Sequence, residues 1–199
     1  MSPATVAITL ILAVLATATA VYWGFVLGRL IRLARHTPLL EDGLELPVVD
    51  DLVSVIVPAH DEARVIERMV ASMRAQRDAR IELVVVLDRC TDDTLARLEA
   101  AAEDDPRIRP IVNDTCPDDW AGKCHAASVG AAAARGDWLL FTDADVRFDV
   151  DVIRAAVAIA DAESIDLLSA YTRLTSGHWW EAVVQPPAAI TLLRMFPPD

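Results

Sequence analysis

Short apolar runs alternate with amphipathic stretches between residues 52 and 171, and this alternation restricts the possible folds more than any other feature. The first run, 52–58, is rich in β-branched residues and is stopped by Pro58, which is typical of a buried strand. Further strands are predicted at 81–87, 108–112, 138–142 and 166–171, and helices at 65–73, 91–103, 122–134 and 149–160. Strands separated by helices of this length predict an α/β domain with a mostly parallel sheet and crossover helices.

Acidic residues follow three of the predicted strands. Asp61 comes after the first strand, Asp88 after the second, and Asp143 and Asp145 after the fourth. Ligands of open parallel sheets bind beyond the carboxyl ends of the strands. The sequence therefore places these carboxylates at one edge of the sheet, where a polar ligand would bind.

The sequence Asp143-Ala144-Asp145 predicts a metal site. Two carboxylates one residue apart, in a turn that leaves a buried strand, can face the same crevice. Mg²⁺ and Mn²⁺ prefer oxygen ligands and usually bind one or two carboxylates together with substrate phosphates. We therefore predict a divalent metal, Mg²⁺ or Mn²⁺, on Asp143 and Asp145, where it would neutralise a departing diphosphate. Asp149 and Asp151 have the same spacing, but the start of a helix explains that pair better.

Two further residues have both a functional and an ordinary explanation. Asp88 could accept a hydrogen bond from the imide N–H of uracil, or it could be a loop aspartate near a helix N-terminus, and spacing alone does not separate these. Lys123 is the only lysine in the chain and follows Gly122 at the predicted start of a helix, where an ammonium group can meet a phosphate. The alternative, a surface lysine, is less persuasive in a chain that uses lysine nowhere else.

The first part of the chain predicts a membrane anchor. No charged residue occurs from Ala4 to Gly28, and about 20 apolar residues span a bilayer core as a helix. Arg29, Arg32 and Arg35 follow this run, so the positive-inside rule predicts a protein of the cell membrane whose N-terminus is outside and whose remaining domain is cytoplasmic. Residues 1–36 are thus the expected transmembrane anchor with a basic flank, and 37–51, with two prolines and five acids, the expected linker.

The charge balance argues against a nucleic-acid partner. The net charge is −12, and no basic stripe is available to neutralise phosphates along a strand. The three cysteines lack the paired spacing of a zinc site and are expected to be reduced thiols.

Four motifs occur in a recognisable order: VSVIVPAHDE at 53–62, VLDRCTDDT at 86–94, GK at 122–123 and DAD at 143–145. Together they resemble the inverting family 2 glycosyltransferases with a GT-A fold. The resemblance implies a nucleotide-sugar-binding domain at 52–175 and an enzyme that takes a sugar from a UDP-sugar. The residues implied to bind the donor nucleotide are Pro58, His60, Glu62, Asp88, Lys123 and Asp143, with Asp143 and Asp145 on the metal diphosphate. His60 departs from the family's usual Asn, and Leu87-Asp88 from its common Asp-Asp pair, which bears on the choice of base.

The stretch 120–126, with the region 179–195, looks most like the hopene-associated and ceramide-glucosyltransferase-like membrane branch of that family. This likeness implies a lipid or lipid-linked acceptor at the cytoplasmic membrane face. It also implies that 176–199 is an amphipathic interfacial segment, with packing against a missing domain half as the alternative. Glu181 is interpreted as part of that segment rather than as a catalytic base.

Family members carry a catalytic-base carboxylate well downstream of the Asp-x-Asp sequence, so the base is expected beyond residue 199. The chain is accordingly expected to be C-terminally incomplete: a fragment, a truncated gene product or half of a split enzyme. The rival hypothesis is a non-catalytic module that binds a nucleotide sugar. A nucleotidyltransferase is disfavoured because no Gly-rich phosphate loop lies near the first strand.

Overall fold

The computed structural model describes residues 2–36, 39–170, 177–181, 183–185 and 191. The chain divides into two units. One comprises residues 39–170, and the other comprises residues 1–38 together with 171–199.

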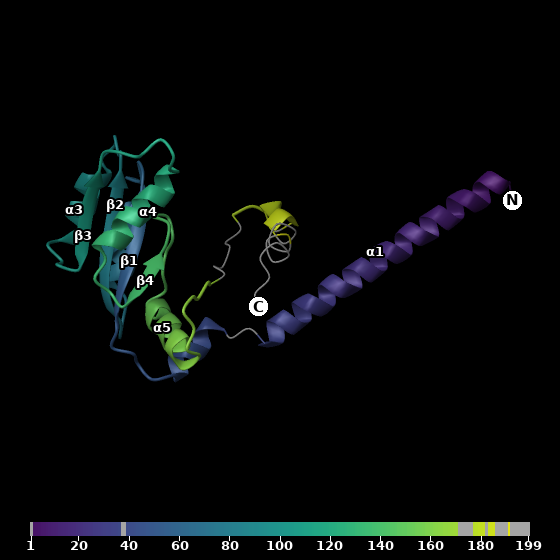
Figure 1. Ribbon diagram of the computed structural model, residues 1–199, viewed down its shortest axis with the longest axis horizontal. Helices are drawn as coiled ribbons and strands as arrows, with labels where there is room; N and C mark the ends of the chain where they lie inside the picture. The colour runs from purple at the N-terminus through teal and green to yellow at the C-terminus, as the bar shows by residue number, and fades with distance from the viewer. Residues whose placement is uncertain (1, 37–38, 171–176, 182, 186–190, 192–199) are drawn as a thin grey trace. The chain divides into compact units, whose positions relative to one another are not determined.

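The unit of residues 39–170 is an α/β domain built on a four-stranded sheet (Figure 1). The strands are β1 (Leu52–Ala59), β2 (Arg80–Asp88), β3 (Ile108–Asn113) and β4 (Trp138–Phe141). The helices are α2 (Ile66–Arg74), α3 (Thr94–Ala102), α4 (Gly122–Ala133) and α5 (Val152–Ala162). The strand order is β3-β2-β1-β4, and all three pairings are parallel. The predicted alternation of strands and helices is therefore present from 52 to 162.

Apolar side chains on both faces of the central strands explain why the sheet is buried between helices. In β2, Leu83, Val85 and Leu87 belong to the larger core, which α2, α3 and α5 cover. Val84 and Val86 belong to a second, smaller cluster together with Ala126 of α4. The helix α4 covers this face of the sheet (Figure 1). Successive side chains of a strand alternate between faces, so a strand that is covered on both sides is apolar throughout.

The parallel register brings the ends of three strands together. Ala59 of β1 pairs with Leu87 of β2, and Ile56 pairs with Phe141 of β4. Because the strands run in the same direction, the loops that follow β1, β2 and β4 leave from one edge of the sheet. This edge is where ligands bind in open α/β sheets.

Two expectations from the sequence are corrected by the structure. The predicted strand at 166–171 is wrong for its described residues, because 166–170 form no strand, no sheet pairing includes them, and Leu167 is 86% exposed; Tyr171 lies outside the described residues. The expected linker 37–51 contains a 3-10 helix, η1 (Leu40–Glu45), which packs on α5. Gly43 permits this contact, since a Cβ there would lie 2.2 Å from the Ala155 carbonyl oxygen.

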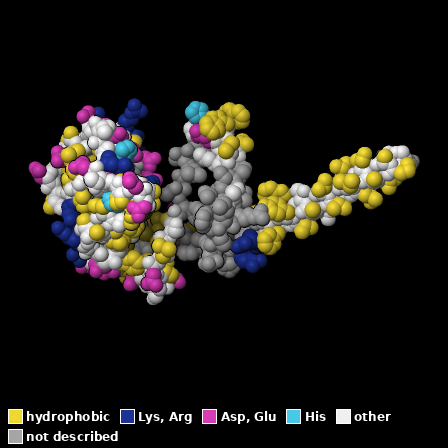
Figure 2. Space-filling view, turned by 45° about the horizontal axis from the view of Figure 1, so that its top comes forward, with side chains coloured by type: hydrophobic (Ala, Val, Ile, Leu, Met, Phe, Trp, Pro, Cys, Tyr) yellow, Lys and Arg dark blue, Asp and Glu magenta, His cyan; other side chains and the backbone are white. Residues whose placement is uncertain are grey.

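The other unit contains the helix α1 (Pro3–His36). Its stretch Pro3–Arg32 is long and apolar enough to cross a membrane, and none of it is buried within the protein. Thirty residues of helix span about 45 Å, which exceeds the roughly 30 Å of a bilayer core. Hydrophobic side chains cover most of the visible surface of α1 (Figure 2). The described residues thus contain one helix that could serve as a membrane anchor.

A short helical turn near residue 181 exposes large apolar side chains. Trp179 is 81% exposed and Val183 is 62% exposed. The Glu181 carboxylate accepts hydrogen bonds from the backbone N–H groups of Gly177 (2.6 Å) and His178 (3.1 Å). Glu181 therefore has a structural function in capping this turn.

Candidate functional site

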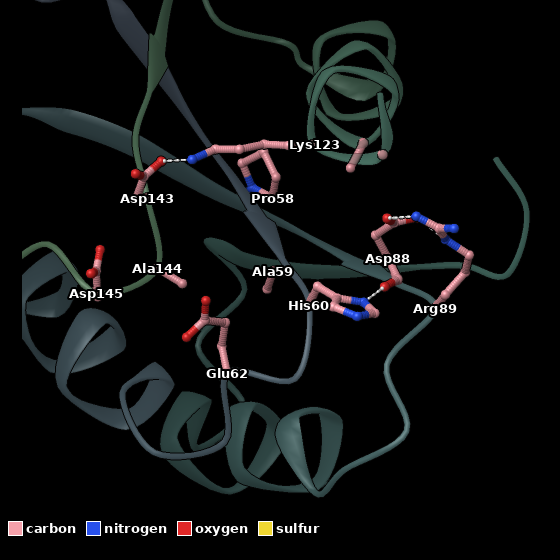
Figure 3. A pocket seen from close by; sticks show the side chains of 12 residues that line it. Pro58, Ala59, His60, Glu62, Asp88, Arg89, Lys123, Asp143, Ala144 and Asp145 are labelled. Carbon is pink, nitrogen blue, oxygen red and sulfur yellow. Dashed lines mark hydrogen bonds and ion pairs between the residues drawn. The ribbon is translucent and has the colours of Figure 1, made fainter. Parts of the chain in front are cut away.

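A pocket of about 310 Å³ lies beyond the carboxyl ends of β1, β2 and β4, beside the start of α4 (Figure 3). All seven residues that the sequence predicted for the donor and metal sites line it, although they are spread over 88 positions of the chain. The lining residues are Pro58, Ala59, His60, Glu62, Asp88, Arg89, Gly122, Lys123, Ala126, Asp143, Ala144 and Asp145. Figure 3 shows Asp143 and Asp145 on one side of the pocket and Asp88 with Arg89 on the other.

The backbone after β4 explains why both carboxylates of the Asp-x-Asp sequence reach the pocket. Thr142 N donates to Ile56 O at 3.1 Å, so the chain stays attached to β1 after the strand ends. Ala144 is then 3% exposed and belongs to the larger core. Asp143 and Asp145, on either side of this buried alanine, are both exposed. The short apolar residue between them fixes the turn and leaves the two carboxylates exposed at the pocket.

Lys123 reaches across the pocket from the first turn of α4 to the Asp-x-Asp sequence (Figure 3). Its Nζ lies 2.5 Å from Asp143 Oδ1, with the two side chains 64% and 53% exposed. The only ammonium side chain of the protein is thus placed beside a predicted metal ligand. It can meet an anionic group that enters between α4 and β4.

Asp88 ends β2 and is the most buried acid of the pocket, at 4% exposed. Its carboxylate accepts hydrogen bonds from Arg89 Nη2 at 2.8 Å and from Asn113 Nδ2 at 2.9 Å. The Arg89 guanidinium, helped by Asn113, holds the pKa of the Asp88 carboxyl below its ordinary value against the opposing effect of burial. Asp88 is therefore an ionised acceptor at neutral pH, a suitable partner for an N–H group of a nucleobase.

Arg89 is a pocket residue that sequence reasoning missed. Its backbone is left-handed, with φ of 51°, and this turn folds the guanidinium back onto the carboxylate of the preceding residue. Gly122 permits the arrangement, because a Cβ there would lie 2.4 Å from Arg89 Nη2 and 3.0 Å from Asp88 Oδ2. The glycine before Lys123 thus lets the start of α4 approach the Asp88–Arg89 pair.

Asp61, one of the acids predicted at the strand ends, does not line the pocket. Its carboxylate accepts hydrogen bonds from the backbone N–H groups of Thr91 (2.7 Å) and Asp92 (3.2 Å). The bond from Thr91 is the main cause of its lowered pKa. The helix α3 begins at Thr94 rather than at the predicted residue 91.

The loop after β1 is also tied to β2 through His60. His60 Nδ1 donates to the backbone carbonyl oxygen of Asp88 at 2.6 Å, and Glu62 N donates to Thr94 Oγ1 at 2.8 Å. The loops that carry the predicted uridine-binding residues are thereby fixed to each other. The side chains of His60 and Glu62 are not buried, so both remain available to a ligand.

The donor atoms of the pocket fit a divalent metal that is shared with a phosphate ligand. Within the described part of the chain, no group of three or more His, Cys, Asp or Glu side chains is arranged to hold a metal by itself. Two exposed carboxylates do border the pocket, Asp143 and Asp145. Magnesium-type sites often combine one or two carboxylates with substrate phosphates and water, so this set fits such an ion.

An open parallel sheet with a polar pocket beyond its carboxyl ends is the architecture of nucleotide-binding α/β proteins. The model of the family described as Glycosyl transferase family 2 matches residues 54–193. The chain therefore belongs to the family 2 glycosyltransferases.

Curated relatives agree with this membership. The succinoglycan biosynthesis protein ExoO of Rhizobium meliloti is 36% identical over 118 residues, which cover 58% of this chain and 32% of that protein. The 4,4'-diaponeurosporenoate glycosyltransferase of Staphylococcus haemolyticus is 32% identical over 97 residues, covering 49% of this chain and 25% of that protein. The chain thus spans about a third or less of these relatives.

Two solved structures show the same fold with nucleotide sugars bound. The mannosyltransferase PcManGT from Pyrobaculum calidifontis, in complex with GDP-Man and Mn²⁺, gives a TM-score of 0.56 and 26% identity, covering 74% of this chain and 43% of that one. Residues 1–349 of TarS from S. aureus, in complex with UDP-GlcNAc, give a TM-score of 0.55 and 25% identity, covering 63% of this chain and 36% of that one. The predicted GT-A fold and glycosyltransferase class are confirmed.

Proposed function

We propose that this pocket binds a UDP-sugar together with Mg²⁺ or Mn²⁺, and that the protein transfers the sugar, with inversion, to a lipid or lipid-linked acceptor. The observation that carries the donor site is the convergence of seven predicted residues on one pocket. The comparison structures support a nucleotide sugar as the ligand, since each contains one. A divalent metal is supported by the Mn²⁺ in one of them and by the two exposed carboxylates here.

Each side of the pocket has a distinct task in this proposal. Asp88 accepts the imide N–H of uracil, because its lowered pKa keeps it ionised and Arg89 and Asn113 fix its direction. The loop from Pro58 to Glu62 forms the wall beside the uridine. This division places the base at the ends of β1 and β2.

The diphosphate lies at the other side, near α4 and β4. Lys123 and the N-terminus of α4 attract its negative charge. Asp143 and Asp145 hold the metal, which when bound stabilises the charge that develops on the leaving nucleoside diphosphate. The protein's own side chains thus orient the donor with its sugar directed out of the pocket.

The acceptor side is proposed from other features. The apolar helix α1, followed by Arg29, Arg32 and Arg35, supports an anchor whose pocket domain is cytoplasmic. The exposed apolar turn near residue 181 supports an interfacial segment. Both would bring a membrane-bound acceptor within reach. No residue is assigned as the base that deprotonates the acceptor hydroxyl, and the Glu181 carboxylate accepts hydrogen bonds from the backbone of its own helical turn.

Release of UDP tests the proposal and separates it from the rival, a non-catalytic binding module. The protein in its native membranes would be incubated with radiolabelled UDP-sugars, Mn²⁺ and lipid extract, and both free UDP and labelled lipid would be measured. We expect Asp143→Asn and Asp145→Asn to abolish turnover. Asp161→Asn, which changes an exposed carboxylate of α5 outside the pocket, should leave it intact. Metal-dependent donor binding without turnover would support the binding module instead.

A further inference from the structure

The ion pair between Lys123 and Asp143 occupies one of the two carboxylates proposed for the metal. The 2.5 Å contact sets an ammonium group where a divalent cation would otherwise approach Asp143. Asp145, two residues later, has no hydrogen bond or ion pair among the described residues. The protein without ligand therefore offers a metal one free carboxylate and one that is already neutralised.

This arrangement disfavours the metal when it arrives alone. The pocket has no group of three metal-binding side chains within the described residues, so a lone cation depends on Asp143 and Asp145. To bind both, the metal must displace Lys123 from Asp143 and then remain close to a positive charge. Both effects lower the affinity for the free ion.

A nucleoside diphosphate offers Lys123 an alternative anionic partner to Asp143. Lysine is a point charge with three donors on a flexible stem, so it can leave a carboxylate and bind a phosphate oxygen nearby. Both partners of the pair are more than half exposed, and exposed ion pairs are weak and readily exchanged. If Lys123 turned to the diphosphate, Asp143 would become free to hold the metal together with Asp145, and phosphate oxygens would supply further ligands.

We propose that Lys123 couples the two ligands: it holds Asp143 until a nucleoside diphosphate draws it away, so that nucleotide and metal bind together and the free metal binds poorly. This inference rests on the proposed donor site. The coupling is reciprocal by thermodynamic necessity, so the metal must raise nucleotide affinity by the same factor.

Binding measurements on Lys123→Met test the proposal without any turnover. Mn²⁺ alone is titrated by the electron paramagnetic resonance signal of the free ion, and UDP alone is titrated by calorimetry in the presence of a chelator. We expect the variant to bind Mn²⁺ alone about two- to fivefold more tightly, the range expected for removing one exposed ion pair. UDP alone should bind more weakly, by about threefold or more, since its ammonium partner is gone.

Tighter Mn²⁺ binding together with weaker UDP binding would indicate that Lys123 competes with the metal for Asp143. Damage to the fold would instead weaken the binding of both ligands. Lys123→Arg keeps the charge and should keep Mn²⁺ affinity near the wild-type value. Arg147→Met removes an exposed cation that does not line the pocket and controls for general electrostatics, so its Mn²⁺ affinity should also be unchanged. Unchanged or weaker Mn²⁺ binding by Lys123→Met overturns the proposal.

Amine labelling gives a second readout, because Lys123 is the only lysine. An amine-reactive ester, followed by mass spectrometry of the peptide that contains Lys123, should show slower modification with UDP and Mn²⁺ present. Failure of the wild-type chain to bind UDP with Mn²⁺ would refute the donor site itself. Normal joint binding with unaltered Mn²⁺ affinity in Lys123→Met would refute only the coupling.

Discussion

Replacing Gly122 with alanine tests the nucleobase end of the pocket. The new Cβ would lie 2.4 Å from Arg89 Nη2 and 3.0 Å from Asp88 Oδ2. Arg89 is 46% exposed and can swing aside, whereas Asp88 is buried and held by Asn113. The methyl group therefore displaces the guanidinium and covers the carboxylate oxygen that would accept a hydrogen bond from the base.

The size of the effect follows from the bond that is blocked. A hydrogen bond to a charged group contributes about 1.5–3 kcal/mol, which corresponds to roughly 10- to 150-fold weaker UDP binding. Stability should change much less. Losing the partly exposed contact between Arg89 and Asp88 costs about 0–1 kcal/mol, and alanine gains up to about 1 kcal/mol over glycine in a helix. The free energy of unfolding should thus stay within about 1 kcal/mol of the wild type.

Calorimetric titration of UDP with Mn²⁺, paired with thermal unfolding, provides the assay. Ser128→Ala, on the exposed face of α4 and outside the pocket, controls for a side-chain change on the same helix. A double-mutant cycle with Asp88→Asn gives the mechanism: if both changes act through one carboxylate, the double variant should bind UDP no more weakly than Asp88→Asn alone. UDP affinity within twofold of the wild type, or strictly additive losses, would refute the reasoning.

Two further predictions concern stability, measured by urea unfolding in detergent. Gly130→Ala puts a Cβ 2.5 Å from Ile56 Cγ2 and 3.1 Å from Val86 Cγ2, so overpacking should outweigh helix propensity and lower the free energy of unfolding by about 1–2 kcal/mol; a more stable variant would contradict this. Hydrogen bonds from Arg107 lower the pKa of Asp105 from 3.8 to about 2. The ionised Asp105 carboxylate therefore stabilises the fold above about pH 4, and this stabilisation is lost as the pH falls toward 2. Asp105→Asn should therefore lower the free energy of unfolding by about 1 kcal/mol at pH 7, a value kept small because Arg107 is partly exposed to solvent. The loss should become smaller below pH 4. An equal cost at pH 7 and pH 3 would contradict the assignment.

Parallel topology was sufficient to place Asp88, Asp143 and Asp145 at one edge of the sheet, whereas Pro58, His60 and Glu62 were implied by the family resemblance. The same topological argument also placed Asp61 there, and Asp61 does not line the pocket. Asp88 and Asp143 are 55 positions apart, yet each directly follows an apolar run whose direction is set by its crossover helix. Lys123 was found from composition, as the only lysine, and from its glycine neighbour. The apolar runs and the Gly-Lys pair are local sequence patterns, so they can be recognised without knowledge of the strand order.

Other features depend on contacts between distant segments and left no local signal. Arg89 enters the pocket only through a left-handed backbone that folds it onto Asp88. The 3-10 helix η1 forms because Gly43 can approach α5, 112 positions away along the chain at Ala155. The apolar pattern at 166–171 predicted a strand, but a strand also needs a hydrogen-bonded neighbour, and residues 166–170 pair with none.

The central claim is that the pocket binds a nucleoside diphosphate sugar through a metal held by Asp143 and Asp145. The most direct test is the affinity for a UDP-sugar measured by calorimetry with and without Mn²⁺, in the wild type, Asp145→Ala and the control Asp161→Ala. Mn²⁺ should raise the affinity by about 5- to 150-fold, the usual range of coupling between two ligands, in the wild type and the control. Asp145→Ala should lose this increase. Affinity that is indifferent to Mn²⁺ and to Asp145 would contradict the account.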